Sequence, residues 1–457
     1  MRFINLTRQT EIGANSYFVE IDGKRLILDS GLHPKNEGVA ALPQYRPVPE
    51  RSIDAVLVSH AHQDHIGSLP CLMRRQPQAP VFMTQATSRL SEVMLHNSVN
   101  VMLRQRDELG INEYPLFTHR ETDQATTLWQ NVGLRQRWTL DGERVPNSDS
   151  ELTFEMFDAG HILGSAGILF RAGGRKIFYT GDVNFMDQTL VRSADFPEEK
   201  LDILIIETTR GDRHGTPGFT REAEERRFLE ALRAAFDRGG SVLIPVFALG
   251  KTQEVLTMLY TFRREGALVD VPVYIGGLST KITIVHDELA SSAPRQFPGL
   301  RLLDSLSPYV LSGREVASTQ IRKNRIYAMS SGMMTEKTLS NLLAARFLSD
   351  PKQSIYFVGY ADPDSPGGKL KAGQPGDLVR LDNNLPSQKL ECTIEQFDFS
   401  AHASREQLLE YIKKTSPQVV LLVHGDPPSV AWFKETIDRE MPGTTAVIPE
   451  PGKEYAF

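Results

Sequence analysis

Four stretches of the chain share one pattern, an apolar run of the buried-strand type that ends directly in polar residues. The stretches are DAVLVSHAH (54–62), KIFYTGD (176–182), LDILIIET (201–208) and QVVLLVHGD (418–426). Continuous apolar runs of this length are typical of strands that are covered on both faces. In layered α/β proteins the carboxyl ends of such strands meet along one edge of a sheet, where functional groups gather. The pattern therefore predicts an α/β fold whose functional side chains come from distant parts of the chain.

The first of these stretches ends in the densest polar group, which contains His60, His62, Asp64 and His65. Only 11 of the 457 residues are histidine, so this spacing favours a ligand site over a solvated turn, which would use Asn, Ser and Pro more freely. Imidazole and carboxylate groups are the ligands that zinc prefers. The chain has only two cysteines, which rules out a Cys-rich zinc module, so His and Asp would hold any zinc.

Three further candidates follow buried-type strands: His161 in DAGHILGSAG, Asp182 in YTGD and His424 in LVHGD. Taken singly, each has a structural interpretation, either as a histidine in a glycine-rich loop or as a turn residue. Taken together, they complete two three-ligand groups and one shared carboxylate, which is the set that two metal ions require. Six of the 11 histidines, counting His402, fall in such clusters, and this concentration favours a site.

The pattern of the chain changes after Gly211. The stretch 220–240 predicts a helix, because Thr220 can cap it and apolar residues recur along one face before a glycine pair ends it. Strands and helices then alternate to about residue 360, which predicts a separate parallel-sheet domain inserted into the first one. The predicted boundaries are 1–210 for the first part of the first domain, 211–390 for the inserted domain and 391–457 for the second part of the first domain.

Charge and hydropathy limit the partners. The net charge is −6, so a nucleic acid would need a local basic groove, because the molecule as a whole repels phosphate. The N-terminal MRFINLTRQTEIG is polar, and no run of 18 apolar residues occurs, which predicts no membrane partner and a cytoplasmic location. The sequence leaves the oligomeric state open.

The order and spacing of these motifs resemble a known family. HAHQDH, GHILGS, TGD and LVHG are similar to motifs two to five of the metallo-β-lactamase superfamily, with Asp29 in LDSG as motif one. The long insertion between Asp182 and His424, with Glu207 in IIETTRGD and His402 in FSAHA, resembles the β-CASP branch. That branch contains nucleases related to the endonuclease subunit of the cleavage and polyadenylation specificity factor and to RNase J. The resemblance implies an αββα sandwich with an inserted parallel sheet that is flanked by helices.

The resemblance also implies roles for the candidate residues. In the family pattern, two groups of three ligands each bind one zinc and an aspartate bridges both: His60, His62 and His161; Asp64, His65 and His424; and Asp182 as the bridge. Asp29 would form hydrogen bonds near the ligand loop without binding metal. Asp64 would orient a hydroxide activated by the two zinc ions. His402, paired with Glu207, would supply the proton that the leaving group needs.

Substrate contacts are suggested by weaker motifs. AMSSGMMTEKT (328–338) resembles the family's phosphate-binding turn, with Ser330, Ser331, Gly332 and Met333 as its residues, although an ordinary helix start explains it equally well. Lys251 occupies a basic position at the rim of the family's active site. IRKNR (321–325) is interpreted as a solvated basic face, with a nucleic-acid contact as the alternative. Arg210, Thr335 and Glu336 depart from the family pattern and leave the substrate preference open.

The leading hypothesis is a zinc-dependent ribonuclease that hydrolyses single-stranded RNA, as an endonuclease, a 5′-exonuclease or both, in RNA processing or decay. A histidine at position 424 goes with RNA processing in this family, whereas DNA-repair members usually carry an aliphatic residue there. The alternatives are a DNA nuclease, an ester or thioester hydrolase acting on small molecules, and an inactive scaffold subunit. The last of these is disfavoured because all seven ligand positions are filled.

Overall fold

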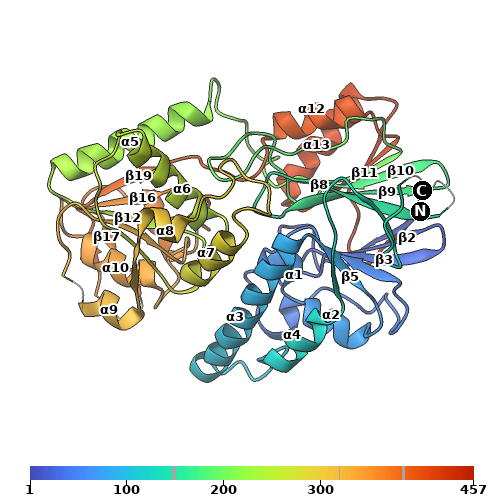
Figure 1. Ribbon diagram of the computed structural model, residues 1–457, viewed down its shortest axis with the longest axis horizontal. Helices are drawn as coiled ribbons and strands as arrows, with labels where there is room; N and C mark the ends of the chain where they lie inside the picture. The colour runs from blue at the N-terminus through green and yellow to red at the C-terminus, as the bar shows by residue number, and fades with distance from the viewer. Residues whose placement is uncertain (147–150, 319, 383–385) are drawn as a thin grey trace. The chain divides into compact units, whose positions relative to one another are not determined.

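The computed structural model describes residues 1–146, 151–318, 320–382 and 386–457. These residues form two compact units (Figure 1). The first unit contains residues 1–187, 193–216 and 401–457, and the second contains residues 188–192 and 217–400. Each unit has its own sheet structure and its own hydrophobic core.

The first unit is built on two mixed sheets. The first sheet contains, in spatial order, β22 (Glu454–Ala456), β1 (Arg2–Asn5), β2 (Tyr17–Ile21), β3 (Lys24–Leu28), β4 (Ala55–Leu57), β5 (Val81–Met83) and β6 (Trp129–Asn131). The second sheet contains β21 (Thr445–Val447), β20 (Val419–Val423), β11 (Ile203–Glu207), β10 (Arg175–Tyr179), β9 (Ala166–Ala172), β8 (Thr153–Asp158) and β7 (Arg137–Thr139). Strands β11 and β20 pair in parallel although the whole inserted segment separates them in the sequence.

The two sheets pack face to face over one apolar core. Phe3, Tyr17 and Phe82 of the first sheet share this core with Phe154 and Phe170 of the second sheet. Burial of each such side chain stabilises the fold by about 1.5–3 kcal/mol. The alternation of strand side chains leaves a second apolar face on each sheet, and helices must cover those faces.

Helices cover the outer faces of both sheets. Against the first sheet lie α2 (Leu69–Arg75), α3 (Gln85–Leu109) and α4 (His119–Thr126). Against the second sheet lie α12 (Arg405–Thr415) and α13 (Pro427–Glu440). The arrangement is the predicted αββα sandwich, which is thereby confirmed.

The second unit contains a parallel sheet in the order β14 (Tyr309–Leu311), β13 (Val273–Gly276), β15 (Ile326–Met329), β12 (Val242–Pro245), β16 (Ser354–Phe357) and β19 (Thr393–Gln396). Around it lie α5 (Arg221–Asp237), α6 (Lys251–Arg264), α7 (Leu278–Glu288), α8 (Leu302–Leu306), α9 (Gly313–Ser318), α10 (Leu339–Phe347) and α11 (Pro366–Ala372), with a small ribbon of β17 (Leu378–Val379) and β18 (Gln388–Lys389). Helix α5 begins where the sequence predicts, because the Thr220 hydroxyl accepts a hydrogen bond from the Ala223 N–H. The predicted parallel sheet flanked by helices is confirmed. Strand β19 pairs with β16 and belongs to the second unit, although the sequence placed residues 391–457 in the first domain.

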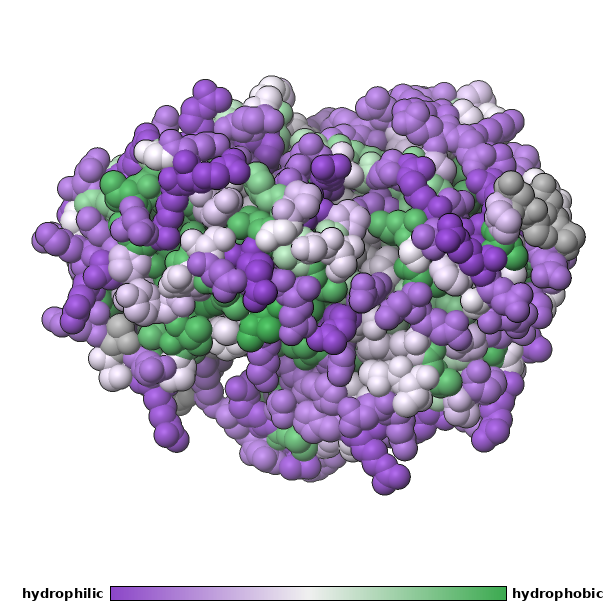
Figure 2. Space-filling model, in the orientation of Figure 1, coloured by the Kyte–Doolittle hydropathy of each residue, from purple (hydrophilic) through white to green (hydrophobic). Residues whose placement is uncertain are grey.

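Hydrophilic side chains cover most of the visible face in Figure 2, with hydrophobic patches between them. Among the residues that the structure describes, we find no helix that combines the length and the apolar character needed to cross a lipid bilayer.

Candidate metal centre

The histidine-rich loop follows β4 in the first unit, and His62 is the residue that precedes helix α1 (Gln63–Ile66). Helix α1 carries Asp64 and His65. Backbone hydrogen bonds from two other segments hold this part of the chain. The Asp64 carbonyl accepts the Asn15 N–H at 2.9 Å, and the His65 carbonyl accepts the Ser30 N–H at 2.7 Å. The backbone approach is so close that a Cβ atom at position 31 would lie 1.7 Å from the Asp64 carbonyl oxygen. Glycine is therefore required in the LDSG motif, and it fixes the loop that carries the candidate ligands.

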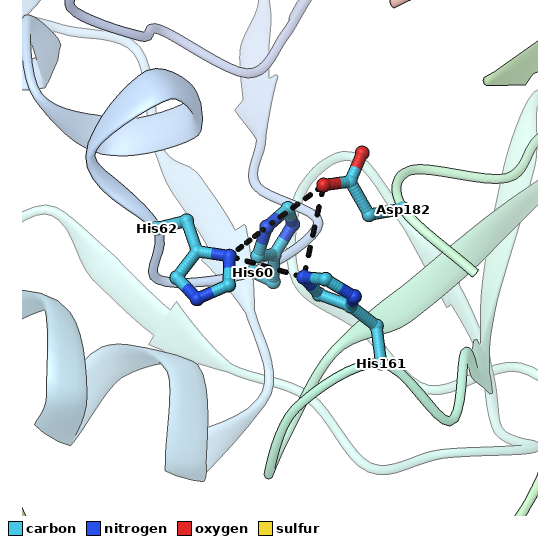
Figure 3. A group of neighbouring side chains, drawn as sticks. All are labelled: His60, His62, His161 and Asp182. Carbon is cyan, nitrogen blue, oxygen red and sulfur yellow. Dashed lines mark hydrogen bonds and ion pairs between the residues drawn. The ribbon is translucent and has the colours of Figure 1, made fainter. Parts of the chain in front are cut away.

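The first ligand group consists of His60, His62, His161 and Asp182 (Figure 3). His62 Nδ1 lies 3.2 Å from His60 Nε2 and 3.0 Å from His161 Nε2. Asp182 Oδ2 lies 3.5 Å from His60 Nε2 and 3.7 Å from His161 Nε2. The four donor atoms lie within 4.8 Å of one another, and His161 Nδ1 donates to the Ala401 carbonyl at 2.8 Å, which directs its Nε2 into the group.

The second group consists of Asp64, His65 and His424. Asp64 Oδ2 lies 3.4 Å from His424 Nε2 and 3.9 Å from His65 Nε2. The other oxygen of Asp182, Oδ1, lies 3.4 Å from His65 Nε2 and 3.2 Å from His424 Nδ1. Asp182 therefore turns one carboxylate oxygen toward each group, which is the geometry of a ligand shared by two ions.

The electrostatics of this cluster suit cations. Burial and the neighbouring histidines hold the pKa of His60 and His161 well below the usual value, and burial lowers the pKa of His62 to about 4. These imidazoles are neutral near pH 7, which is the form that binds metal. Burial alone would raise the pKa of Asp64 and Asp182. The adjacent histidines outweigh burial, so the pKa of Asp64 falls to about 2 and that of Asp182 lies well below its usual value. The first group thus presents the ionised Asp182 carboxylate beside three neutral imidazoles.

One buried oxygen atom, Asp182 Oδ1, also indicates a cation site. Asp182 Oδ1 accepts no hydrogen bond from the described residues, although the side chain is only 3% exposed. A buried carboxylate oxygen without a donor is costly, and a cation between Asp182, His65 and His424 would satisfy it. The residues present therefore fit divalent metal ions.

Asp29 lies behind the second group and is fully buried. Its Oδ2 lies 2.7 Å from His65 Nδ1 and accepts hydrogen bonds from the hydroxyls of Ser59 and Tyr179 at 2.7 and 2.6 Å. Its Oδ1 accepts the Ser59 N–H at 2.7 Å. Burial would lower the pKa of His65, but Asp182, Asp29 and Asp64 outweigh it and raise that pKa well above the usual value. Sequence reasoning missed Ser59 and Tyr179, although each stands next to a recognised motif.

His402 and Glu207 form a pair beside the first group. His402 Nδ1 lies 3.1 Å from both Glu207 carboxylate oxygens, and its Nε2 lies 4.0 Å from Asp182 Oδ2. Glu207 also accepts the Val183 and Thr209 N–H groups at 2.7 and 3.3 Å. Burial would lower the pKa of His402, but the charge and hydrogen bond of Glu207 outweigh it and raise that pKa. Glu207 is thus held by backbone donors, and it orients the imidazole.

Thr209 is a further residue that sequence reasoning missed. Its Oγ1 lies 2.9 Å from His424 Nδ1 and thereby helps to orient this ring. The only sequence signal is its position two residues after Glu207.

The predicted phosphate contacts all belong to the second unit, whereas every candidate metal ligand belongs to the first. The turn 330–333 follows β15, where Ser340 Oγ donates to the Ser331 carbonyl at 2.6 Å and Gly367 N–H donates to the Met333 carbonyl at 2.9 Å. A Cβ atom on Gly332 would meet the Phe247 N–H at 3.1 Å. Lys251 is the first residue of α6 and donates through Nζ to the Phe399 carbonyl. Burial and nearby Arg221 lower the pKa of Lys251 to about 8.

A two-sheet αββα sandwich that gathers histidine and aspartate at the ends of its strands defines the class of the metallo-β-lactamase fold. Three family models match the chain in consecutive segments. Residues 24–246 match a beta-lactamase superfamily domain, residues 252–370 match a Beta-Casp domain, and residues 387–449 match a Zn-dependent metallo-hydrolase RNA specificity domain. The chain belongs to the β-CASP family of the metallo-β-lactamase superfamily, as the motif resemblance predicted.

Curated relatives agree with this assignment. The chain is 29% identical to cleavage and polyadenylation specificity factor subunit 3 of Dictyostelium discoideum, over 98% of this chain and 56% of the relative. It is 26% identical to endoribonuclease YSH1 of Saccharomyces cerevisiae, over 95% of this chain and 56% of the relative. It is 27% identical to an RNase J-like protein of Methanocaldococcus jannaschii, over 93% of each chain. The chain thus spans little more than half the length of the first two relatives.

A solved structure shares the fold. A protein of unknown function from Enterococcus faecalis aligns over the whole of both chains with a TM-score of 0.57 and 12% identity. At that identity the likeness concerns the fold alone.

Proposed function

We propose that the protein is a zinc-dependent ribonuclease that hydrolyses RNA phosphodiester bonds with two metal ions per chain. The observation that carries the proposal is the division of Asp182 between the two ligand groups, with the His402–Glu207 pair beside them. The RNA specificity model at 387–449 and the RNA-processing names of the relatives support RNA as the substrate.

The proposed ligands follow the two groups described above: His60, His62 and His161 for one ion, Asp64, His65 and His424 for the other, and Asp182 for both. When bound, two such ions neutralise the scissile phosphate and lower the pKa of water to about 7. Asp64, whose side chain is 22% exposed, would accept a hydrogen bond from the attacking water and orient it. His402, held through Nδ1 by Glu207, would donate a proton to the leaving oxygen as the P–O bond breaks. In the second unit, Lys251 and the turn of Ser330, Ser331, Gly332 and Met333 would contact substrate phosphates.

The test of substrate class uses one sequence prepared as RNA and as DNA, each labelled at the 5′ end or the 3′ end. We expect cleavage of the RNA, loss of that cleavage after chelation, and its recovery on adding zinc, with about two zinc ions per chain by mass spectrometry. The two labels separate internal cutting from removal of 5′ nucleotides. Cleavage of the DNA alone would replace the proposal with a DNA nuclease, and cleavage of neither would refute a nuclease function.

Asp29→Asn is expected to weaken zinc binding by about 10- to 100-fold, because a neutral amide no longer holds the His65 imidazole as a carboxylate does. The measurement is zinc retention against a competing chelator. Tyr179→Phe is the matched control, since it removes one hydrogen bond to Asp29 and leaves the carboxylate in place. Unchanged zinc retention in Asp29→Asn would show that the hydrogen bond to His65 has no part in metal binding.

A further inference from the structure

A row of three tyrosines crosses the sheet of the second unit. Tyr309, Tyr274 and Tyr327 lie at matching positions of the adjacent strands β14, β13 and β15. The ring centroids of Tyr309 and Tyr274 are 5.1 Å apart with an interplanar angle of 25°, and those of Tyr274 and Tyr327 are 4.8 Å apart at 19°. The three rings therefore form a continuous stack on one face of the sheet.

The stack runs from the core to the solvent. Tyr327 is 1% exposed and packs edge-on against Phe347, whereas Tyr309 is 57% exposed. Strand β14 is the edge of this sheet, and none of the described residues forms a further strand beyond Tyr309. The outermost ring thus offers one aromatic face where another flat ring can continue the stack at the same spacing.

The basic stretch 321–325 leads directly into β15 and therefore lies at the amino-terminal edge of the parallel sheet, next to the tyrosine row. Among the described residues, no carboxylate forms an ion pair with Arg322, Lys323 or Arg325. The Arg325 Nε–H is buried without a hydrogen-bond acceptor. Burial and Tyr274 raise the pKa of Tyr327 to about 12, against the opposing charges of Arg325, Arg346 and Arg322.

We infer that Tyr309 and the basic stretch 321–325 form a binding surface for single-stranded RNA. An exposed ring in a pre-formed stack accepts a nucleobase, and arginine and lysine side chains without a carboxylate partner neutralise phosphates of the same RNA strand. The inference deepens the proposed function and rests on RNA as the substrate. Within the second unit, this surface is separate from the predicted phosphate-binding turn, because that turn follows the carboxyl end of β15 and the tyrosines lie near its amino end.

Binding is measured by fluorescence anisotropy with a labelled 12-nucleotide phosphorothioate oligoadenylate, which resists hydrolysis, and the metal-loaded protein. We expect Tyr309→Ala to bind roughly 5- to 100-fold more weakly, the range for loss of one stacked base. Tyr309→Phe keeps the ring and should bind like the wild type. The loss should be smaller for oligouridylate, since pyrimidines stack less strongly, and absent for an RNA duplex, whose bases are already stacked.

A second pair of variants tests the phosphate contacts. Arg322→Gln with Lys323→Gln is expected to reduce the slope of log affinity against log salt by about 1.4, or about 0.7 for each lost contact. Arg226→Gln with Lys281→Gln removes the same charge from exposed positions of α5 and α7 and should leave the slope unchanged.

The outcomes separate this surface from the nuclease function. If the wild type cleaves RNA and Tyr309→Ala binds RNA with unchanged affinity, the surface is refuted and the nuclease stands. If no RNA is cleaved but RNA binding depends on Tyr309, the RNA-binding surface is supported and the nuclease function is refuted. If light scattering shows a dimer that Tyr309→Ala abolishes, with RNA affinity unchanged, the edge strand joins two copies of the chain and the inference is wrong.

Discussion

The Asp182→Ala variant is expected to hold at most one metal ion per chain and to show no RNA cleavage. Its two oxygens face different groups, Oδ2 toward His60 and His161 and Oδ1 toward His65 and His424. Removing the carboxylate therefore removes one ligand from each proposed ion. It also removes the negative charge that lies between the two ions. The measurements are metal content by mass spectrometry and cleavage of the end-labelled RNA.

Two further variants make the Asp182 result specific. Asp182→Asn keeps the shape of the side chain and one carbonyl oxygen. Any metal that this variant loses is therefore lost because the negative charge is missing, and not because a cavity was created. Asp107→Ala removes an exposed carboxylate from helix α3 in the same unit and should leave both readouts unchanged. Two zinc ions and normal cleavage in Asp182→Ala would exclude the proposed ligation.

The His402→Ala variant is expected to keep two zinc ions and to cleave RNA about 10²- to 10⁴-fold more slowly. The reason is that His402 is positioned by Glu207 and that each of the two proposed ligand groups has at least three members without it, although Asp182, Glu207 and His402 also lie close together. A proton donor matters only when the leaving oxygen is a poor leaving group. The loss of rate should therefore shrink on a nucleotide ester whose leaving group is p-nitrophenolate.

His119→Ala is the matched control for His402→Ala, because His119 is an exposed histidine of the same unit whose ring stacks on that of His96. Loss of zinc in His402→Ala would make His402 a ligand, and equal slowing on both substrates would make it a positioning residue. Glu207→Gln is a less selective probe, since Glu207 also accepts the Val183 and Thr209 N–H groups.

Much of the fold was predictable because its buried strands have a clear sequence pattern, an apolar run that ends in polar residues. The apolar runs that end at His60, Asp182 and His424 are buried strands with polar ends, and sheet geometry brings such ends together. Strand β19 illustrates the limit. Its residues TIEQ are only partly buried or exposed, so the sequence carries no apolar signal that would assign it to the second unit.

The candidate ligands could be found because their residue types are rare and their spacing is unusual, whereas the residues that hold them are common types. Ser59 reaches Asp29 because β4 pairs with β3, whereas the Tyr179 hydroxyl reaches it from β10 of the other sheet. The tyrosine row shows the same limit, because only the strand order β14–β13–β15 makes neighbours of Tyr309, Tyr274 and Tyr327. No local pattern in the sequence reports that order.

The parallel pairing of β11 with β20 has a consequence during synthesis of the chain. The residues of β11 are all buried in the finished sheet, yet their partner strand begins 212 positions after Glu207, at Val419. At about 5–20 residues per second, a ribosome needs roughly 10–40 s to deliver it. Throughout that interval the nascent protein exposes an apolar strand edge and lacks His424, so it is prone to aggregation and its second ligand group is incomplete. The inserted segment thus delays assembly of the candidate metal centre until the ribosome has synthesised the second unit.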